Sequence, residues 1–237
     1  MTTIAIIPAR GGSKGIVGKN LVDLNGKPLI DYTLAAAKEA NVIDQIFVST
    51  DDENIADYCI SRNVKVPYRR PPNIALDNSS MIEVVLDALE WLEKNERQIP
   101  DKVIVLQPTS PLRNSQDIDQ ALKLMLKFNY ESMTSVHKMT EHPYECVQED
   151  GQGWKNLVEF EGQLIRRQDY QGHFYFINGA IYAMTPGFIE RHKALFCPGN
   201  QTMLFPMPPH RGIDIDTYDD LYRAEAYLSH PRLSQNN

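Results

Sequence analysis

The chain has 237 residues, a formal net charge of −7 and a pI near 5.4, with 42% hydrophobic and 23% charged residues. This ordinary globular composition predicts one sizeable α/β domain and excludes a disordered chain. The acidic net charge argues against nucleic acid as a partner, although a local cluster of cations can still bind a nucleotide.

The cysteines and the lengths of the apolar segments indicate the cellular compartment. Cys59, Cys146 and Cys197 are odd in number, far apart and lack any Cys-x-x-Cys spacing, which predicts structural thiols in a reducing compartment. No apolar stretch approaches the ~20 residues of a membrane span, and the N-terminus has no signal-peptide pattern. We therefore expect a cytoplasmic protein that does not contact membranes.

Short apolar runs alternate with segments of helical spacing from residue 4 to residue 137. The apolar runs predict strands at Ile4–Ile7, Gln45–Thr50, Val64–Tyr68, Lys102–Leu106 and Ser132–His137. The helical spacing predicts helices at Leu29–Ala40, Glu53–Arg62, Ser79–Asn95 and Ser115–Phe128. Asp51 or Asp52 can cap the second of these helices. The alternation indicates βαβ units and a doubly wound, mostly parallel sheet.

This regularity stops at residues 139–178, which predict a β-rich insertion or flap within a single domain spanning 1–237. The insertion contains strand-like pieces at Tyr144–Gln148, Trp154–Phe160 and His173–Ile177. After it, the pattern predicts a strand at Ala180–Met184 and helices near Gly187–His192 and Tyr218–Leu228.

A loop rich in glycine and cations follows the first strand. It holds four glycines and three cations, namely Gly11, Gly12, Gly15, Gly18, Arg10, Lys14 and Lys19. Glycines allow backbone N–H groups to approach a ligand closely, and cations favour a polyanion. Because open α/β sheets bind nucleotides at this place, the loop is predicted to hold phosphates.

The spacing of this loop differs from two known phosphate motifs. A P-loop needs Ser or Thr after Gly18-Lys19, where Asn20 stands. The dinucleotide fingerprint needs Gly-x-Gly-x-x-Gly, which Gly11-Gly12 breaks. A plain glycine-rich turn is the competing interpretation, but the cations and the preceding buried strand favour a phosphate site.

Residues after the other strands are candidates as well, because ligands bind outside the carboxyl ends of parallel strands. Gln107–Arg113 forms a loop that Pro108 and Pro111 stiffen, so that its polar side chains can hydrogen-bond a ligand. The competing interpretation is a connector whose polar groups satisfy its own backbone. Arg69-Arg70 could clamp a phosphate or lie exposed, and Ser79 or Ser80 could cap the helix that follows and present N–H groups.

Asp214 and Asp216 share one face if their segment is extended. Two carboxylates beside a phosphate loop suit Mg²⁺ held together with substrate oxygens. Helix capping by Asp216 or Thr217 is the competing interpretation, and it leaves Asp214 unexplained. The six histidines show no metal-ligand spacing and suggest neither zinc nor a Ser–His–Asp triad.

Together these segments resemble the acylneuraminate cytidylyltransferases, the CMP-sialic acid synthetases, a family that includes the legionaminic and pseudaminic acid cytidylyltransferases. Residues 7–20 (IPARGGSKGIVGKN) resemble the family signature. Further matches follow in order at Arg70-Pro71 with Asp77, Ser79-Ser80, 106–113 (LQPTSPLR), Arg167-Gln168, 178–182 (NGAIY) and 213–216 (IDID). The matches cover nearly the whole chain.

The resemblance implies a role for each matching residue. CTP would be held by Arg10, Gly11, Gly12, Ser13, Lys19, Asn20, Arg70 and Ser80. The sugar acid would be bound by Gln107, Arg167, Tyr182 and Phe196. Asp214 and Asp216 would coordinate Mg²⁺ or Mn²⁺, and with Arg10 and Lys19 they would form the catalytic set.

The resemblance also implies a Rossmann-like nucleotidyltransferase fold and a homodimer. In this family the β-rich segment, here about 139–178 with Arg167, reaches across to the partner's site. The implied reaction transfers CMP from CTP to the C2 hydroxyl of a nine-carbon 2-keto sugar acid of the N-acetylneuraminate or legionaminate type, and releases pyrophosphate.

One departure from the family pattern leaves the exact sugar open. After His142-Pro143 relatives of the neuraminate type often carry a basic residue, whereas Tyr144-Glu145 stand here. Pseudaminic acid or an eight-carbon sugar acid is therefore a second possible acceptor. Two rival functions are a sugar-1-phosphate pyrophosphorylase and a catalytically inactive nucleotide- or sugar-binding relative.

Overall fold

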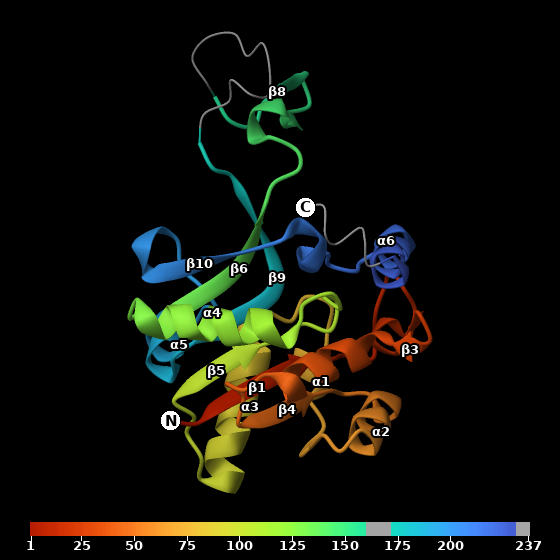
Figure 1. Ribbon diagram of the computed structural model, residues 1–237, viewed down its shortest axis with the longest axis vertical. Coiled ribbons are helices and arrows are strands. Elements are labelled where there is room, and N and C mark those ends of the chain that lie inside the picture. The colour runs from red at the N-terminus through yellow and green to blue at the C-terminus, as the bar shows by residue number, and fades with distance from the viewer. Residues whose placement is uncertain (160–171, 231–237) are drawn as a thin grey trace.

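A computed structural model of the chain describes residues 1–159 and 172–230. Its centre is a six-stranded sheet with the order β10-β6-β9-β5-β1-β4 (Figure 1). The strands are β1 (Thr3–Pro8), β4 (Gln45–Ser49), β5 (Lys102–Val105), β6 (Ser132–Lys138), β9 (Tyr175–Met184) and β10 (Thr202–Met207). All run parallel except β9, which is antiparallel to both β5 and β6. The predicted mostly parallel sheet is confirmed.

Helices cover both faces of this sheet, as a doubly wound fold requires. They are α1 (Leu29–Glu39), α2 (Glu53–Ser61), α3 (Met81–Glu96), α4 (Ser115–Lys127) and α5 (Pro186–His192), while α6 (Tyr218–Ser229) packs in a third apolar cluster with Leu24 and Leu29. Alternation along β1 sends Ala5 and Ile7 into the core with α1, α2 and α4, and Ile4 and Ile6 into the core with α3 and α5. Burial of both faces explains why this strand reads as an unbroken apolar run.

Polar caps fix where the helices begin. The Asp52 side chain accepts a hydrogen bond from the Ile55 N–H at the start of α2, as predicted. Ser80, Asn114 and Thr217 begin α3, α4 and α6, each with a capping box. Since Thr217 caps α6, capping does not account for Asp216.

Two strand predictions were wrong. Val64–Tyr68 forms no strand, and the only bridge nearby joins the following Arg69 to Thr50; Pro67 has no backbone N–H to donate to a strand partner. The two strands expected at His173–Ile177 and Ala180–Met184 are one strand, β9, which has an irregular register opposite Thr134 and Val136.

Three strands were missed: β10 and the two strands of a small hairpin. Edge strand β10 alternates buried Phe205 and Met207 with exposed Pro206, and a proline normally argues against a strand except at an edge. The small hairpin of β2 (Asp23–Leu24) and β3 (Lys27–Pro28) turns at Asn25-Gly26, with φ of 53° and 82°. Asn-Gly is a strong hairpin signal that was available in the sequence.

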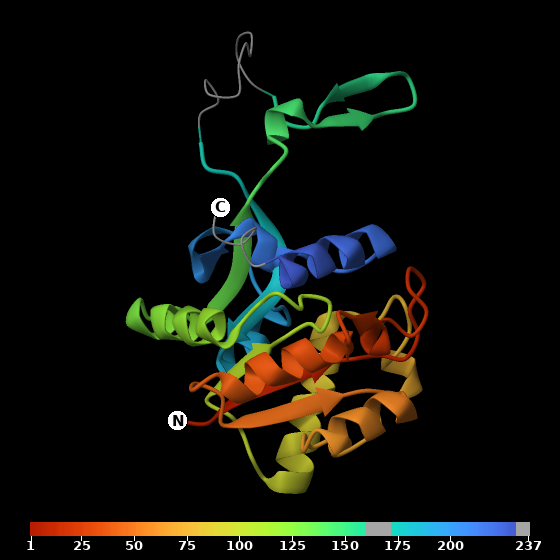
Figure 2. The same cartoon turned by 45° about the vertical axis from the view of Figure 1, so that its right-hand side comes forward.

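The insertion between β6 and β9 projects from the body of the molecule as an arm (Figure 2). Because β9 returns antiparallel to β6, the arm leaves and re-enters at the carboxyl end of the parallel strands. It carries the hairpin of β7 (Val147–Glu149) and β8 (Trp154–Asn156), both shorter than predicted. A 3₁₀ turn at Pro143–Glu145 replaces the start of the first predicted piece. The single-domain boundaries remain a prediction.

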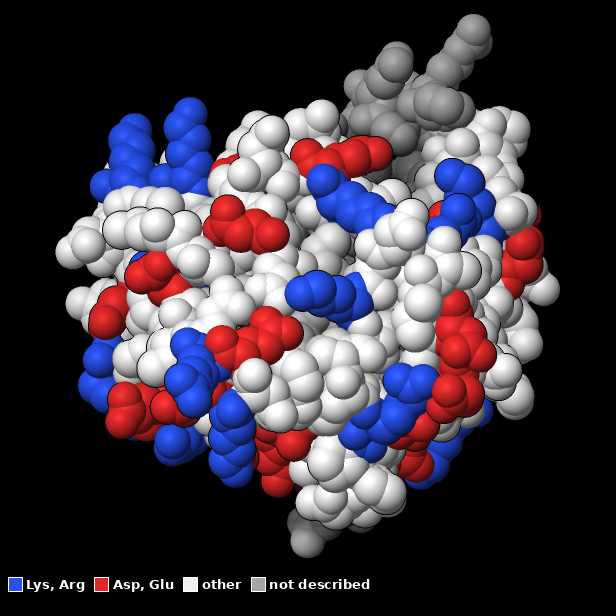
Figure 3. Space-filling view, turned by 90° about the horizontal axis from the view of Figure 1, so that it is seen from below, with Lys and Arg blue, Asp and Glu red and all other residues white. Residues whose placement is uncertain are grey.

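The surface charges, the helices and the cysteines can be compared with what the composition predicted. Acidic and basic side chains are interspersed on the face shown in Figure 3. Among the helices within residues 1–159 and 172–230, none is both long and apolar enough to cross a membrane. All three cysteines are free thiols, and burial raises the pKa of Cys59 to about 12.

Candidate active site

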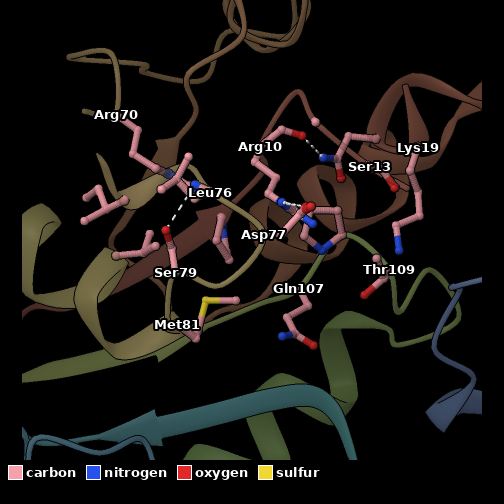
Figure 4. Close-up of a pocket in the computed structure, with 16 residues that line it drawn as sticks. Arg10, Ser13, Lys19, Arg70, Leu76, Asp77, Ser79, Met81, Gln107 and Thr109 are labelled. Atoms are coloured by element: carbon pink, nitrogen blue, oxygen red, sulfur yellow. Dashed lines mark hydrogen bonds and ion pairs between the residues drawn. The ribbon is translucent and has the colours of Figure 1, made fainter. Parts of the chain in front are cut away.

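A cavity of about 190 Å³ opens at the carboxyl ends of β1 and β5. The glycine-rich loop, the segment before α3 and the start of the Gln107 loop surround it (Figure 4). Seven of the residues predicted to bind substrate line it, namely Arg10, Gly12, Ser13, Lys19, Asn20, Arg70 and Gln107. The loops after β1 and β5 and the segment before α3 therefore meet at one cavity, whereas Asp214 and Asp216 line a neighbouring one described below.

Arg10 and Lys14 share one internal counter-ion, Asp77. Arg10 points at Asp77 and forms an ion pair with one carboxylate oxygen (Figure 4), while Lys14 Nζ lies 2.7 Å from the other. Hydrogen bonds from Lys14 and then Arg10 lower the pKa of Asp77. Asp77 was not among the predicted site residues, although its motif was part of the resemblance.

The backbone of the glycine-rich loop is fixed by side chains around it. Asn20 Nδ2 donates to the Arg10 carbonyl at 2.8 Å, and the Gly11 N–H donates to Asp51 Oδ1 at 3.0 Å. A Cβ on Gly15 would lie 2.3 Å from the Asp216 carbonyl oxygen, so only glycine fits there. Gly11 and Gly15 therefore serve the packing of the loop itself.

Lys19 joins this loop to the aspartate pair. Its Nζ donates to the Ile215 carbonyl and to Asp216 Oδ1, both at 2.8 Å. Beneath the loop, fully buried Ile16 belongs to the same apolar cluster as Ile213 and Ile215. A polar and an apolar contact thus hold the loop against the segment that carries the carboxylates.

Asp214 and Asp216 lie on the same side of their segment, as the alternation predicted. Ile213 and Ile215 are buried, and the two aspartates line a second cavity of about 600 Å³ between the base of the arm and α6. The Ile215 N–H donates to the Thr109 carbonyl at 2.8 Å, which ties the pair to the Gln107 loop. Burial raises the pKa of Asp214, and the nearby Asp216 charge adds to this shift.

The aspartate pair fits a divalent cation that also binds a substrate. Asp214 Oδ1 is buried and has no hydrogen-bond partner among the described residues, which leaves a carboxylate oxygen available as a ligand. No cluster of three or more potential ligands occurs in residues 1–159 and 172–230. Mg²⁺ characteristically uses one or two carboxylates and completes its shell with water and substrate phosphates.

Three residues predicted to bind the sugar lie together beside the aspartates. Gln107 Oε1 occupies the space above Gly179, where a Cβ would lie 2.4 Å away, and Gly179 has a φ of +72°. The Tyr182 ring stacks on Phe196, with centroids 6.1 Å apart and planes 8° from parallel. Burial, and secondarily the Asp214 charge, raises the pKa of Tyr182. This group of Gln107, Gly179, Tyr182 and Phe196 is called the sugar end below.

The two neighbouring arginines have different surroundings. Arg70 is buried, lines the cavity and donates to the Ser49 hydroxyl at 3.0 Å and to the Ser49 carbonyl at 2.5 Å. Arg69 pairs with Glu53 on the surface, at 2.8 Å. Ser80 caps α3 and Ser79 lines the cavity in its place, so a nucleotide contact for Ser80 remains a prediction. Arg167 lies outside the described residues.

Comparison with known proteins decides the family. A family model described as "Cytidylyltransferase" matches residues 4–153. The chain belongs to this cytidylyltransferase family.

Relatives within this family match almost the whole chain. CMP-N,N'-diacetyllegionaminic acid synthase of Legionella pneumophila is 36% identical, covering 96% of this chain and 97% of that protein. Pseudaminic acid cytidylyltransferase of Campylobacter jejuni is 31% identical, covering 95% of each. N-acylneuraminate cytidylyltransferase of Streptococcus agalactiae serotype V is 33% identical over 96% of this chain. The chain spans only 54% of the length of that relative.

Solved structures confirm the fold of the family. A CMP:2-keto-3-deoxy-manno-octonic acid synthetase complexed with CTP has a TM-score of 0.69 at 18% identity, covering 97% of this chain and 99% of that one. 4-Diphosphocytidyl-2C-methyl-D-erythritol synthase from Anaerococcus prevotii has a TM-score of 0.65 at 16% identity, with the same coverage. At these identities the likeness concerns the fold alone.

Proposed function

We propose that this chain transfers CMP from CTP to the C2 hydroxyl of a nine-carbon 2-keto sugar acid of the neuraminate or legionaminate type. The hydroxyl oxygen forms a bond to the α-phosphorus, the bond to the pyrophosphate oxygen breaks, and the hydroxyl loses its proton. One observation carries the proposal: Lys19 links the glycine-rich loop to Asp216 at 2.8 Å beside the sugar end. Relatives of 31–36% identity, named for three such sugar acids, support it.

The cations at the loop would stabilise the charge that develops on the transferring phosphate. Lys19 is only partly exposed, which strengthens its interaction with an anion relative to one in water. Arg10 would exchange the Asp77 carboxylate for a phosphate oxygen. The Arg70 guanidinium lies beside Ser49 at the end of β4 and would shape the nucleotide end of the cavity.

The sugar end would orient the attacking hydroxyl. Gln107 presents its amide to the cleft, and the stacked rings of Tyr182 and Phe196 offer an apolar wall to the acylamino group of the sugar. In the proposed homodimer Arg167 would come from the second subunit.

Asp214 and Asp216 would hold Mg²⁺ or Mn²⁺ through carboxylate oxygens, including the unpartnered Oδ1 of Asp214. When bound, such a cation lowers the pKa of a coordinated hydroxyl and neutralises charge on a phosphate.

The assembly and location belong to the same proposal. Two aromatic side chains, Trp154 on the arm and Phe176 on β9 at the base of the arm, are 70% and 54% exposed, and exposed apolar surface of this kind supports a homodimer formed through the arm. Three free cysteines support a reducing, cytoplasmic location.

Pyrophosphate release tests the activity. The protein is mixed with CTP, Mg²⁺ and one member of a panel: neuraminic, legionaminic, pseudaminic or eight-carbon sugar acid. We expect release with at least one nine-carbon acid, and strong preference for the eight-carbon acid would overturn the proposed acceptor. CTP binding without release on the whole panel would instead favour the inactive relative.

A pair of variants tests the metal assignment. Asp216→Ala should abolish release while leaving the fold intact, because the side chain is exposed and does not cap α6. Asp219→Ala, an exposed aspartate in the first turn of α6, is the matched control and should retain activity. Unaltered turnover of Asp216→Ala at limiting Mg²⁺ would contradict the assignment.

A further inference from the structure

Arg113 is a buried cation that the proposed reaction leaves unexplained. It ends the 106–113 motif, is 2% exposed, and forms no ion pair within residues 1–159 and 172–230. Asp117, whose charge acts on Arg113, is itself engaged by Arg211 at 2.6 Å. Burial lowers the pKa of Arg113 to about 10. Burying an arginine without a carboxylate partner is costly, so its hydrogen bonds must offset that cost. The groups that accept those bonds therefore indicate which part of the structure Arg113 holds in place.

Those hydrogen bonds run to the two segments that form the sugar end. Arg113 Nη2 donates to Thr33 Oγ1 on α1 at 2.7 Å, and the Thr33 hydroxyl donates to the Gln107 carbonyl at 3.4 Å. Arg113 Nη1 donates to the Ala180 carbonyl on β9, also at 3.4 Å. One guanidinium therefore reaches both the residue that bears the amide and the strand beneath that amide.

The irregular part of β9 is also fixed from its other side. The Ser135 hydroxyl donates to Asn178 Oδ1 at 2.6 Å and accepts from the Ile181 N–H at 2.8 Å. Asn178 Oδ1 also accepts from the Ala180 N–H at 3.1 Å. These bonds hold the left-handed Gly179, over which the Gln107 side chain lies.

We propose that Arg113 and Thr33 are positioning residues that set the place of the Gln107 amide in the cleft. Arg113 holds the Gln107 main chain through Thr33 and holds its floor through Ala180. Neither residue touches the reacting atoms. The kinetic consequence rests on the proposed function, in which Gln107 contacts the sugar acid.

Thr33 gives the sharper test, since replacing the buried Arg113 could unfold the protein. Thr33→Val removes the hydroxyl at nearly constant volume, and Thr33→Ser restores it. In pyrophosphate release, Thr33→Val should raise the KM for the sugar acid about three- to tenfold, the range expected for one hydrogen bond. The Kd for CTP, measured without sugar, should stay unchanged, and Thr33→Ser should behave like the wild type. The proposal would be overturned if Thr33→Val and Thr33→Ser raised the KM for the sugar acid equally. It would also be overturned if Thr33→Val weakened CTP binding as much as it raised the KM for the sugar acid.

A second readout does not require activity. The Gln107 side-chain amide is followed by NMR in the ¹⁵N-labelled protein without substrates, with Gln107→Glu used for assignment. Thr33→Val should shift or broaden this resonance, and Thr33→Ser should leave it in place. An unmoved resonance in Thr33→Val overturns the positioning role. If the resonance moves in Thr33→Val but the wild-type protein turns over no sugar acid, only the proposed function is overturned.

Discussion

At the phosphate end of the cleft, Arg10 and Lys14 pair with Asp77 near the surface, whereas the sugar end is held by a buried hydrogen-bond network. The side chains of Asp77 and Lys14 are 42% and 82% exposed, but Thr33 and Ser135 are fully buried. Exposed ion pairs are weak and screened by salt, so substrate phosphates can replace them at little cost. A buried network is costly to rearrange, which suits the proposed role of this end in recognising the shape of a sugar acid.

The largest expected effect comes from pushing the loop away from the carboxylates. In Gly15→Ala the new Cβ would lie 2.3 Å from the Asp216 carbonyl oxygen, so the backbone must shift. Because a displacement of about 1 Å can cost roughly 100-fold, kcat/KM for CTP should fall by about that factor. Gly153→Ala, on the arm and outside the cavity, meets no atom within 4 Å and is the control. Equal kinetics for the two variants would show that this contact does not matter.

The neighbours Arg69 and Arg70 allow a buried group to be compared with an exposed one, because Arg70 is buried and Arg69 lies at the surface. Arg70→Ala leaves the buried Ser49 groups without their donors and should lower the free energy of unfolding by about 1–3 kcal/mol in urea titrations. Arg69→Ala removes only the surface pair with Glu53 and should change stability little. A larger loss of unfolding free energy in Arg69→Ala than in Arg70→Ala would contradict the greater structural role given to Arg70.

Asp214 should show a conflict between stability and function. Burial raises its folded pKa above the unfolded value, so its stabilising contribution is present at low pH and is lost as pH rises through the folded pKa. Asp214→Asn should therefore have a higher Tm than the wild type at pH 7 in EDTA, while releasing no pyrophosphate. The Tm difference should shrink as the pH falls toward 3.8 and below. A Tm at pH 7 below that of the wild type would contradict this sign.

The smallest effect is expected for the internal counter-ion. Asp77→Asn removes the carboxylate that competes with phosphates for Arg10 and Lys14, so CTP should bind modestly tighter at low salt. The gain should disappear at 1 M NaCl, where the Debye length is about 3 Å. Titration calorimetry at both salt concentrations measures it. Weaker binding at low salt would mean that Asp77 orients Arg10 instead.

Local sequence patterns predicted most of the sheet and its helices, because the burial of each strand and helix is visible in its own residues. The strand at Ile4–Ile7, the cap at Asp52 and the shared face of Asp214 and Asp216 all follow from neighbours in sequence. Strand β10 was missed because only its edge position makes Pro206 tolerable.

The individual side-chain contacts between distant segments could not be predicted, although the meeting of the strand-end loops could. The partners of Arg113 lie 80 and 67 residues away, and those of Lys19 lie nearly 200 residues away. The sequence alone offers Arg113 only as the end of a stiff loop. The sharing of Asp77 between two cations depends likewise on how a distant segment folds back over the glycine-rich loop.

The single strand β9 begins at the base of the arm and ends in the core of the sheet. Its residues Tyr175–Ile177 pair with the end of β6 where the arm joins the sheet, and the following Asn178–Tyr182 form the floor and wall of the sugar end. The glycine-rich loop lies more than 150 residues earlier in the chain. Under the proposed function, the strand that lines the acceptor pocket is therefore distant in sequence from the loop that would hold CTP, and among the described residues only Gln107 and Phe196 add to that pocket from elsewhere. A change of acceptor could then arise from substitutions in β9, Gln107 or Phe196 that leave residues 10–20 untouched.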